Sequence, residues 1–453
     1  MRRIAISVLF AVLAVGTAGV WAPPSPVPAQ AQAPPDIYIN VTGGGSKKLN
    51  IAIPEFTVVA GSDSAGLAKM IPTVAGNDLT LSGSFSVVAG SDRVPANNPD
   101  ALRQVWSNFA AAGAHAGAHG LLTLRADRVE AEVRLYDLTS PTFPPIASRK
   151  FDTAVTPLSP GFDWRRRLAH KIADDIVLQF TGEKGVADTK ISYVVGPAGA
   201  KEIVVADYDG VGTSPVTRNG SINLSPVWSP DARSIAFTSF MNGYPDLFRL
   251  FPFEPRRGVQ TLASFHGINS SPSWSPDGQS LALTLSKDGN PEIYVLTVQT
   301  GALQRLTRHA SIDTEPTWSP TGQQLAFVSD RAGAPKIFVM ERDGSNVRQV
   351  TASGFHTQPR WSPKGDTIVY TQREGVHNLW VITPGGTNAR PLTSGQGDNQ
   401  GASWAPDGRH LVFQSNRSGR WQVYMMLLDG METTQITTGA GDATSPSWSP
   451  RLP

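Results

Sequence analysis

The amino-acid sequence predicts two domains, a small α/β domain followed by a six-bladed β-propeller with four antiparallel strands in each blade. Two observations predict this fold. A tryptophan phrase recurs six times at spacings of 43 to 46 residues, the length of one propeller blade. The residues before about 182 lack the repeat and mix helical and strand-like apolar patterns. The boundaries are placed at 1–33 for a signal peptide, 34–46 for an N-terminal segment, 47–185 for the α/β domain and 186–453 for the propeller.

Each repeat reads as four short strands joined by tight turns. In the second repeat, Trp274 belongs to the first strand, and Asp277 and Gly278 form the turn after it. Apolar runs follow at 281–285, 293–296 and 303–307. Strands this short, separated by Asp-Gly and Gly-Gly turns, exclude a helical solenoid. The repeated tryptophans are predicted to fill the core between blades; they are Trp228, Trp274, Trp318, Trp361, Trp404 and Trp448.

The six phrases enclose five complete blades, so a sixth blade has to be assembled from both ends of the repeat region. Residues 191–195, 202–206 and 215–217 read as the last three strands of a blade without its first. The sixth phrase, at 446–450, reads as a first strand without the other three. Pairing the two would close the ring and remove the exposed sheet edges.

The first half mixes two kinds of apolar pattern, which predicts a small α/β domain. Short apolar runs indicate strands, and apolar residues three or four positions apart indicate helices. Asp100 is placed as the cap of the second helix, and Gly182 ends the third. The expected elements are strands at 49–53, 121–124 and 129–135 and helices at 67–81, 100–112 and 164–180.

The N-terminus resembles a secretory signal. Arg2 and Arg3 precede an apolar run at 4–20, and two small-x-small cleavage sites end at Ala31 and Ala33. Cleavage at either site would leave an exported chain without another apolar span, so we expect it in the periplasm. The alternative is an uncleaved membrane anchor, because the apolar run is near the lower length limit for spanning.

Composition argues against several other classes of protein. The 39 basic and 37 acidic residues nearly balance and form no run of five or more like charges, so nucleic acid is not expected as a partner. The chain has no cysteine, which excludes disulfides, thiol catalysis and cysteine-bound zinc.

Candidate binding residues precede each tryptophan phrase. These segments are polar and varied, and we expect them to form loops between an outer strand and the next inner strand, around the mouth of the central channel. Such a ring suits capture of an extended peptide by many hydrogen bonds. The alternative is solvated loops without a function. The segments are 222–225, 268–271, 312–315, 355–358, 398–401 and 442–445.

No catalytic motif stands out, so the chain is predicted not to be an enzyme. It contains no G-x-S-x-G, and Gly43 to Gly45 are too short a run for a phosphate loop. His115 and His119 have a zinc-like spacing on a poor scaffold of small residues. We expect no cofactor, although one weakly bound divalent cation could lie in the propeller channel, held by Asp313, Glu315, Asp398 and Asp442.

Several segments resemble the TolB family, periplasmic propellers of the Tol–Pal cell-envelope system. They are 180–185, 191–195, 205–210, 314–318 and 446–450. The resemblance implies a monomeric, non-enzymatic adaptor that supports outer-membrane integrity and constriction at cell division. It also implies two partners, the peptidoglycan-associated lipoprotein Pal and the inner-membrane protein TolA, and leaves room for other outer-membrane proteins.

The resemblance places these partners on two sites. Thr314 and Glu315 match the family's contact with Pal, whereas Ile268 and Ser271 stand where the family has His and Ala. The implied Pal face consists of Ile268, Asn269, Ser271, Asp313, Thr314, Glu315, His356, Gln358, Asn399 and Gln400. The implied TolA contact is a mobile N-terminal segment, Asp36, Ile37, Tyr38, Ile39, Asn40 and Val41.

Two other functions remain open from the sequence. One is a secreted propeller that binds a carbohydrate or small ligand, or a lyase that uses a cation at the channel mouth. The other is a scaffold that works without Pal.

Overall fold

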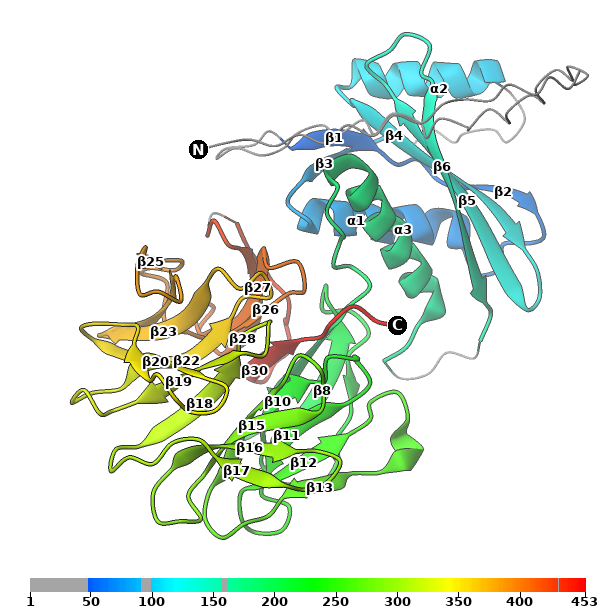
Figure 1. Ribbon diagram of the computed structural model, residues 1–453. Coiled ribbons are helices and arrows are strands. Elements are labelled where there is room, and N and C mark those ends of the chain that lie inside the picture. Colours follow the sequence, from blue (N-terminus) through cyan, green and yellow to red (C-terminus); the bar gives the residue numbers. More distant parts are fainter. Residues whose placement is uncertain (1–47, 91–98, 157–160, 431) are drawn as a thin grey trace, which may run out of the picture. The chain divides into compact units, whose positions relative to one another are not determined.

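The computed structural model describes residues 48–90, 99–156, 161–430 and 432–453. The predicted signal peptide, at 1–33, and the predicted TolA segment, at 36–41, lie outside the described residues. Figure 1 shows a mixed sheet with three helices in the first half of the chain and a ring of four-stranded sheets in the second. Within the described residues, no helix combines the length and the apolarity needed to cross a bilayer.

The α/β domain is built on a sheet with the strand order β3-β1-β4-β5-β6, in which β2 also pairs with β4. β1 runs parallel to β3 and β4, and the last three strands of the order are antiparallel. The strands are β1 (Leu49–Ala52), β2 (Thr57–Ala60), β3 (Phe85–Val88), β4 (Ala116–Leu124), β5 (Arg128–Asp137) and β6 (Pro145–Ala154).

Helices cover both faces of this sheet (Figure 1). α1 (Leu67–Leu81) and α3 (Trp164–Thr181) pack with the inward side chains of β4 and β5 in one apolar core. α2 (Pro99–Ala111) packs on the other face through Trp106, whose ring lies 5.0 Å from that of Tyr136. These contacts bury the apolar stripe of each helix, which is what holds short helices in place.

The sequence predicted most of these elements but not all of them. The helices expected at 67–81 and 164–180 are present, and Gly182 ends α3 with a φ of 74°, a conformation that glycine adopts without strain. The prediction for Asp100 was wrong, because α2 begins at Pro99 and Asp100 therefore lies inside the first turn rather than at its cap. Strands β2, β3 and β6 were not predicted; β6 is a sheet edge whose side chains are mostly exposed, three of them charged.

The propeller has six four-stranded antiparallel sheets, as predicted. Blade one holds β10 (Asn223–Trp228), β11 (Ile235–Ser239), β12 (Asp246–Leu250), η1 (Pro255–Arg257) and β13 (Gln260–Ala263); blade two holds β14 (Asn269–Trp274), β15 (Ser280–Leu285), β16 (Glu292–Thr297) and β17 (Leu303–Arg305); blade three holds β18 (Asp313–Trp318), β19 (Gln324–Ser329), β20 (Lys336–Glu341) and β21 (Arg348–Gln349). Blade four holds β22 (Phe355–Trp361), β23 (Ile368–Glu374), β24 (Val376–Ile382) and β25 (Arg390–Pro391); blade five holds β26 (Asn399–Trp404), β27 (His410–Ser415), β28 (Gln422–Leu427) and β29 (Thr433–Gln435); blade six holds β30 (Ala443–Trp448), β7 (Lys190–Val195), β8 (Glu202–Asp207) and β9 (Ser214–Pro215).

The sixth blade closes the ring as the sequence predicted. β30 pairs antiparallel with β7, with Ala443 opposite Val195 and Trp448 opposite Ile191. The Trp448 indole N–H donates to Thr189 Oγ1 at 2.7 Å. Strands from the two ends of the repeat region thereby form one sheet.

The repeated tryptophans lie between neighbouring blades, also as predicted. Trp274 packs on Ala236 and Leu247 of blade one, and Trp318 packs on Ala282 and Ile293 of blade two. A tight turn follows each of the first five tryptophans, and in the second blade Gly278 takes it with a φ of 69°. All six indoles are buried.

Candidate functional site

The segments before the tryptophan phrases were predicted to be loops, and this was wrong. They form the beginning of the innermost strand of each blade, for example β14 from Asn269 and β18 from Asp313. Each of these six strands carries a bulge, and one residue in it has a positive φ of 50° to 62°. The bulged residues are Ser225, Ser271, Glu315, Gln358, Gly401 and Ser445.

The bulges are joined from blade to blade by hydrogen bonds. The backbone N–H of Gln358 donates to Glu315 Oε2 at 2.6 Å, and that of Gly401 donates to Gln358 Oε1 at 2.9 Å. The Glu315 N–H donates to Thr284 Oγ1 at 3.2 Å. Side chains of one blade therefore satisfy the free backbone donors of the next, which fixes the ring around the channel.

Glu315 is the acidic member of this ring. Burial raises the pKa of its carboxyl group, and the N–H of Gln358 and the charge of Arg360 only partly oppose that shift. Its Thr314 neighbour is half-buried at the mouth. The pair that the resemblance assigned to Pal is thus held at a defined place rather than on a free loop.

Four other members of the predicted Pal face are buried and already bonded to neighbouring side chains or backbone. Asp313 accepts from Arg331 at 2.8 Å, Asn399 accepts from Arg417 at 2.8 Å, and Asn269 donates to the Phe265 carbonyl at 2.7 Å. His356 lies 2.8 Å from Thr351 Oγ1, and burial beside Lys336 lowers its pKa to about 4. These side chains position the mouth rather than presenting a surface.

The exposed part of the mouth is partly apolar. Ile268 is 42% exposed, and Ile312, at the same position of the next blade, is 47% exposed. Ser271, Gln358 and Gln400, which occupy nearby positions in the aligned repeats, are half-buried. Ile312 lies in the candidate segment 312–315 but was not included in the implied Pal face, although aligning the repeats on the tryptophans pairs it with Ile268.

The carboxylates predicted to bind a cation do not come together in one site. Asp313 pairs with Arg331, Asp398 pairs with His377 at 2.8 Å, and Asp442 accepts the Trp421 N–H at 3.1 Å. His115 and His119 also fail to form a pair, because His119 is buried against Thr57 while His115 is exposed. Burial near Arg134 lowers the pKa of His119 to about 4.

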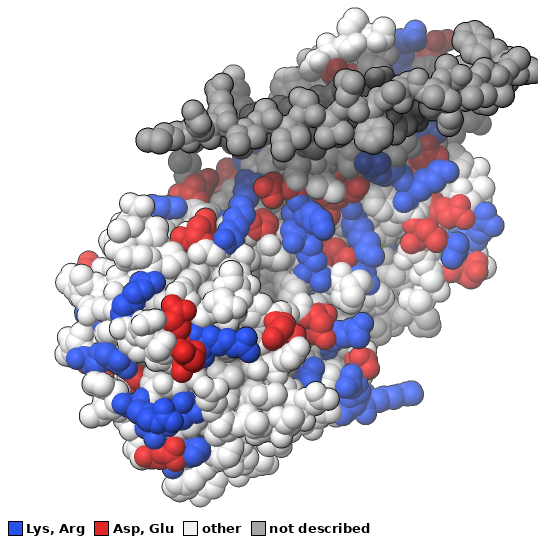
Figure 2. All heavy atoms as spheres, in the orientation of Figure 1, with Lys and Arg blue, Asp and Glu red and all other residues white. Residues whose placement is uncertain are grey.

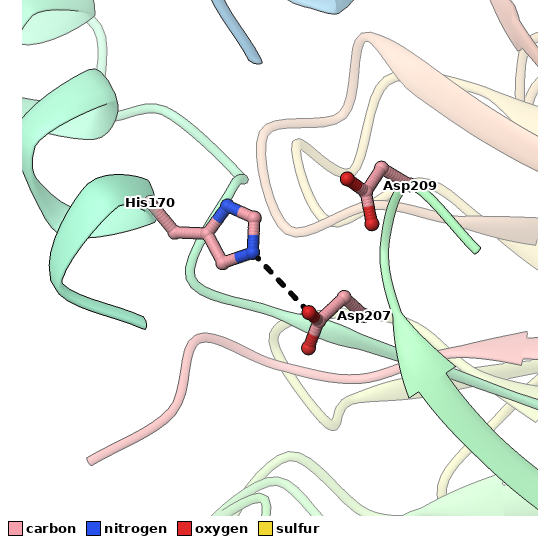
Figure 3. Close-up of side chains that lie close together, drawn as sticks. All are labelled: His170, Asp207 and Asp209. Carbon is pink, nitrogen blue, oxygen red and sulfur yellow. Dashed lines mark hydrogen bonds and ion pairs between the residues drawn. The ribbon is translucent and has the colours of Figure 1, made fainter. Parts of the chain in front are cut away.

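One cluster of histidine and carboxylates does occur within the described part of the chain, and the sequence had not indicated it. Ligand atoms of His170, Asp207 and Asp209 lie within 4.8 Å of one another (Figure 3). His170 comes from α3, whereas Asp207 ends β8 and Asp209 follows it in the turn. The cluster therefore joins the helix to blade six.

Basic side chains form ion pairs with the carboxylates of this cluster. Arg166 donates to Asp207 and to Asp209, each at 2.6 Å, and Lys190 pairs with Asp207. On its other side, His170 Nδ1 lies 2.7 Å from Asp78 of α1. With His170 protonated, three cations (Arg166, His170, Lys190) face three carboxylates (Asp78, Asp207, Asp209), so the group is an ion-pair network and a poor site for a metal cation.

His170 is charged at neutral pH. Burial alone would lower its pKa, but the Asp78 carboxylate and the hydrogen bond to Asp207 outweigh burial and raise the pKa to about 10. The same cations hold the pKa of Asp207 well below its ordinary range. Tyr208, whose hydroxyl donates to Asp78 at 3.0 Å, and Asp174 complete the titratable surroundings.

This network predicts a pH dependence of stability. Because the pKa of His170 rises from about 6.5 in the unfolded chain to about 10, its contribution is complete below pH 6.5 and is lost as the pH rises through 10. We expect the free energy of unfolding, measured with urea from pH 6 to 10, to fall less steeply in His170→Gln than in the parent chain. His115→Gln, an exposed histidine, is the control and should keep the parent slope. Equal slopes in all three would contradict the assignment.

Charges on the surface itself are mixed. On the face shown in Figure 2, Lys and Arg alternate with Asp and Glu and do not gather into one basic patch. This distribution agrees with the near balance of charges in the sequence.

Comparison with known proteins adds independent information. Residues 37–142 match the family described as the TolB amino-terminal domain, and residues 177–376 and 359–452 match the TolB beta propeller domain. The Tol-Pal system protein TolB of Gluconobacter oxydans is 35% identical over 391 residues, which cover 84% of this chain and 80% of the relative. The protein of the same description from Geobacter sulfurreducens is 40% identical over 207 residues, 44% of each chain.

A solved structure agrees with the sequence matches. The crystal structure of TolB from Acinetobacter baumannii superposes with a TM-score of 0.74 at 27% identity, and the match covers 89% of this chain and 97% of that one. Both domains are included in that coverage. The chain belongs to the TolB family.

Proposed function

We propose that the chain is a non-enzymatic, periplasmic component of a Tol–Pal system that binds Pal at the channel mouth of its propeller. Membership of the TolB family and relatives described as Tol-Pal system proteins support this role. The observation that carries the site is the position of Thr314 and Glu315, which match the family's Pal contact and lie in the bonded ring at the mouth. Through Pal, the protein would support outer-membrane integrity and constriction at division.

The exposed apolar side chains give the mouth its binding energy in this proposal. Ile268 and Ile312 are exposed in the free protein, and covering such side chains releases roughly 25 cal/mol for each Å² removed from water. Glu315 and the half-buried amides beside it would then fix the register of the partner by hydrogen bonds. TolA would be engaged separately, by residues 36–41.

The test is calorimetric titration of residues 34–453 with the soluble domain of the host's own Pal. We expect saturable binding, weakened about tenfold by Ile312→Ser, because the side chain would be buried in the complex. Glu315→Gln, which keeps the shape of the side chain, should weaken binding as well. Val59→Ser is the matched control, since Val59 is also 47% exposed but lies on β2 of the α/β domain.

A second titration separates the two partners. A chain that begins at residue 47 should lose binding of the soluble TolA domain while still binding Pal. Absence of heat with Pal at two temperatures, or unchanged affinity in both mouth variants, would contradict the proposed site.

A further inference from the structure

The tryptophan phrases of all six blades line one pocket of about 440 Å³ on the propeller axis. Because the phrases follow the innermost strands, this pocket lies at the end of those strands opposite to the mouth where Glu315 sits. A ring of six prolines forms part of its wall, together with the six indoles. The prolines are Pro230, Pro276, Pro320, Pro363, Pro406 and Pro450.

One ring of side chains supplies the polar groups of this otherwise apolar pocket. The residue before each tryptophan faces the pocket, and in five blades it is small, whereas in blade four it is Arg360. Among the described residues that line the pocket, Arg360 alone carries a charge. The six positions are Val227, Ser273, Thr317, Arg360, Ser403 and Ser447.

The hydroxyl groups of this ring are set to donate. The oxygen of Ser273 accepts the backbone N–H of Trp318 at 3.4 Å, and that of Ser403 accepts the backbone N–H of Trp448 at 3.0 Å. Thr317 Oγ1 accepts the Trp361 N–H at 3.4 Å in the same way. Each of these oxygens accepts one hydrogen bond and keeps its O–H, so the hydroxyl can donate to an acceptor placed in the pocket.

The Arg360 guanidinium also has N–H groups that are free to donate to a ligand. Its Nη1 donates to the Pro359 carbonyl at 2.8 Å, and within the described residues its guanidinium forms no other hydrogen bond and no ion pair. Glu315 is the charge that acts on it, but Glu315 belongs to the mouth and does not line this pocket. The pocket is therefore electropositive at one point and apolar around it.

We propose that this pocket binds a small organic acid, a carboxylate carried on a flat aromatic body. The carboxylate would pair with the Arg360 guanidinium and accept from the neighbouring hydroxyls, while the aromatic body would pack among the indole and proline rings. One guanidinium matches a single negative charge, which favours a carboxylate over a phosphate dianion. A volume of about 440 Å³ lies in the ordinary range for small-molecule sites.

The test uses 3-phenylpropanoate as the probe and residues 34–453 as the protein, with saturation-transfer NMR and tryptophan fluorescence as readouts. We expect saturable binding at millimolar concentration or tighter. The neutral 3-phenylpropanamide should bind at least tenfold more weakly, because it lacks the charge that pairs with Arg360. Equal affinity for the acid and the amide would overturn the proposal.

Variants locate the probe. Arg360→Met should abolish binding and Arg360→Lys should retain part of it, whereas Arg233→Met, an exposed arginine outside the pocket lining, should leave it unchanged. If Arg360→Met fails to fold, Thr317→Val serves instead, and the loss of one hydroxyl donor should weaken the acid about threefold and the amide less, because the hydrogen bond to a charged acceptor is the stronger one. Unchanged acid binding in folded Arg360→Met or in Thr317→Val would place the probe elsewhere. The outcome does not depend on whether the mouth binds Pal.

Discussion

Asp207→Asn should lower the free energy of unfolding by about 3 to 5 kcal/mol, the range found when one partner of a buried ion pair is removed. Asp207 is 6% exposed, accepts from Arg166 at 2.6 Å and also pairs with Lys190. Its replacement leaves three cations, of which His170 and Lys190 are buried, facing two carboxylates. Urea unfolding followed by circular dichroism measures the loss.

A surface pair provides the control for this experiment. Arg128 and Asp152 are both about half exposed and lie 3.2 Å apart, so Asp152→Asn should change stability little, as exposed pairs do. A loss in Asp207→Asn no larger than that in Asp152→Asn would mean that the network contributes nothing to holding α3 on blade six.

Trp448→Ala should destabilise the protein by about 4 kcal/mol, the usual cost of truncating a buried tryptophan. Trp448 is 5% exposed, donates to Thr189 and lies 6.3 Å, centroid to centroid, from the ring of Tyr208. Because it sits on β30, the cavity would open in the sheet that joins the two ends of the repeat region. We therefore expect faster proteolysis along β30 and β7 as well as a lower melting temperature.

Tyr244→Ala is the matched control, since Tyr244 is 75% exposed. It should melt and resist protease like the parent chain. If Trp448→Ala did the same, the closing strand would not be the weak point of the ring.

Some features of the propeller could be predicted from the local sequence and others could not. The blades and their closure were predictable because the phrase around each tryptophan repeats, and a repeat places every strand by analogy with the others. The bulges were not, because a positive φ at Glu315 or Gln358 is set by the hydrogen bonds between blades rather than by the residue type. Repeat alignment does single out Arg360, the one charged residue among six equivalent positions.

The ion-pair network around His170 could not be predicted from the sequence for a different reason. Asp78 is 92 residues from His170 along the chain, and Asp207 is 37 residues away, so no spacing rule connects them. Only the packing of α1 and α3 against blade six brings these charges together. The sequence carried their residue types but no sign of their proximity.

Ring closure by β30 also has a kinetic consequence. The Trp448 and Thr189 side chains that meet at the seam are 259 residues apart, one of the longest separations that folding of this chain has to bridge. Synthesis from the N-terminus makes β7, β8 and β9 long before β30. One edge of β7 therefore lacks its partner strand until residues 443–448 emerge. During that interval the nascent chain offers a template for pairing with other strands, so we expect its yield to depend on chaperones that shield the edge of β7.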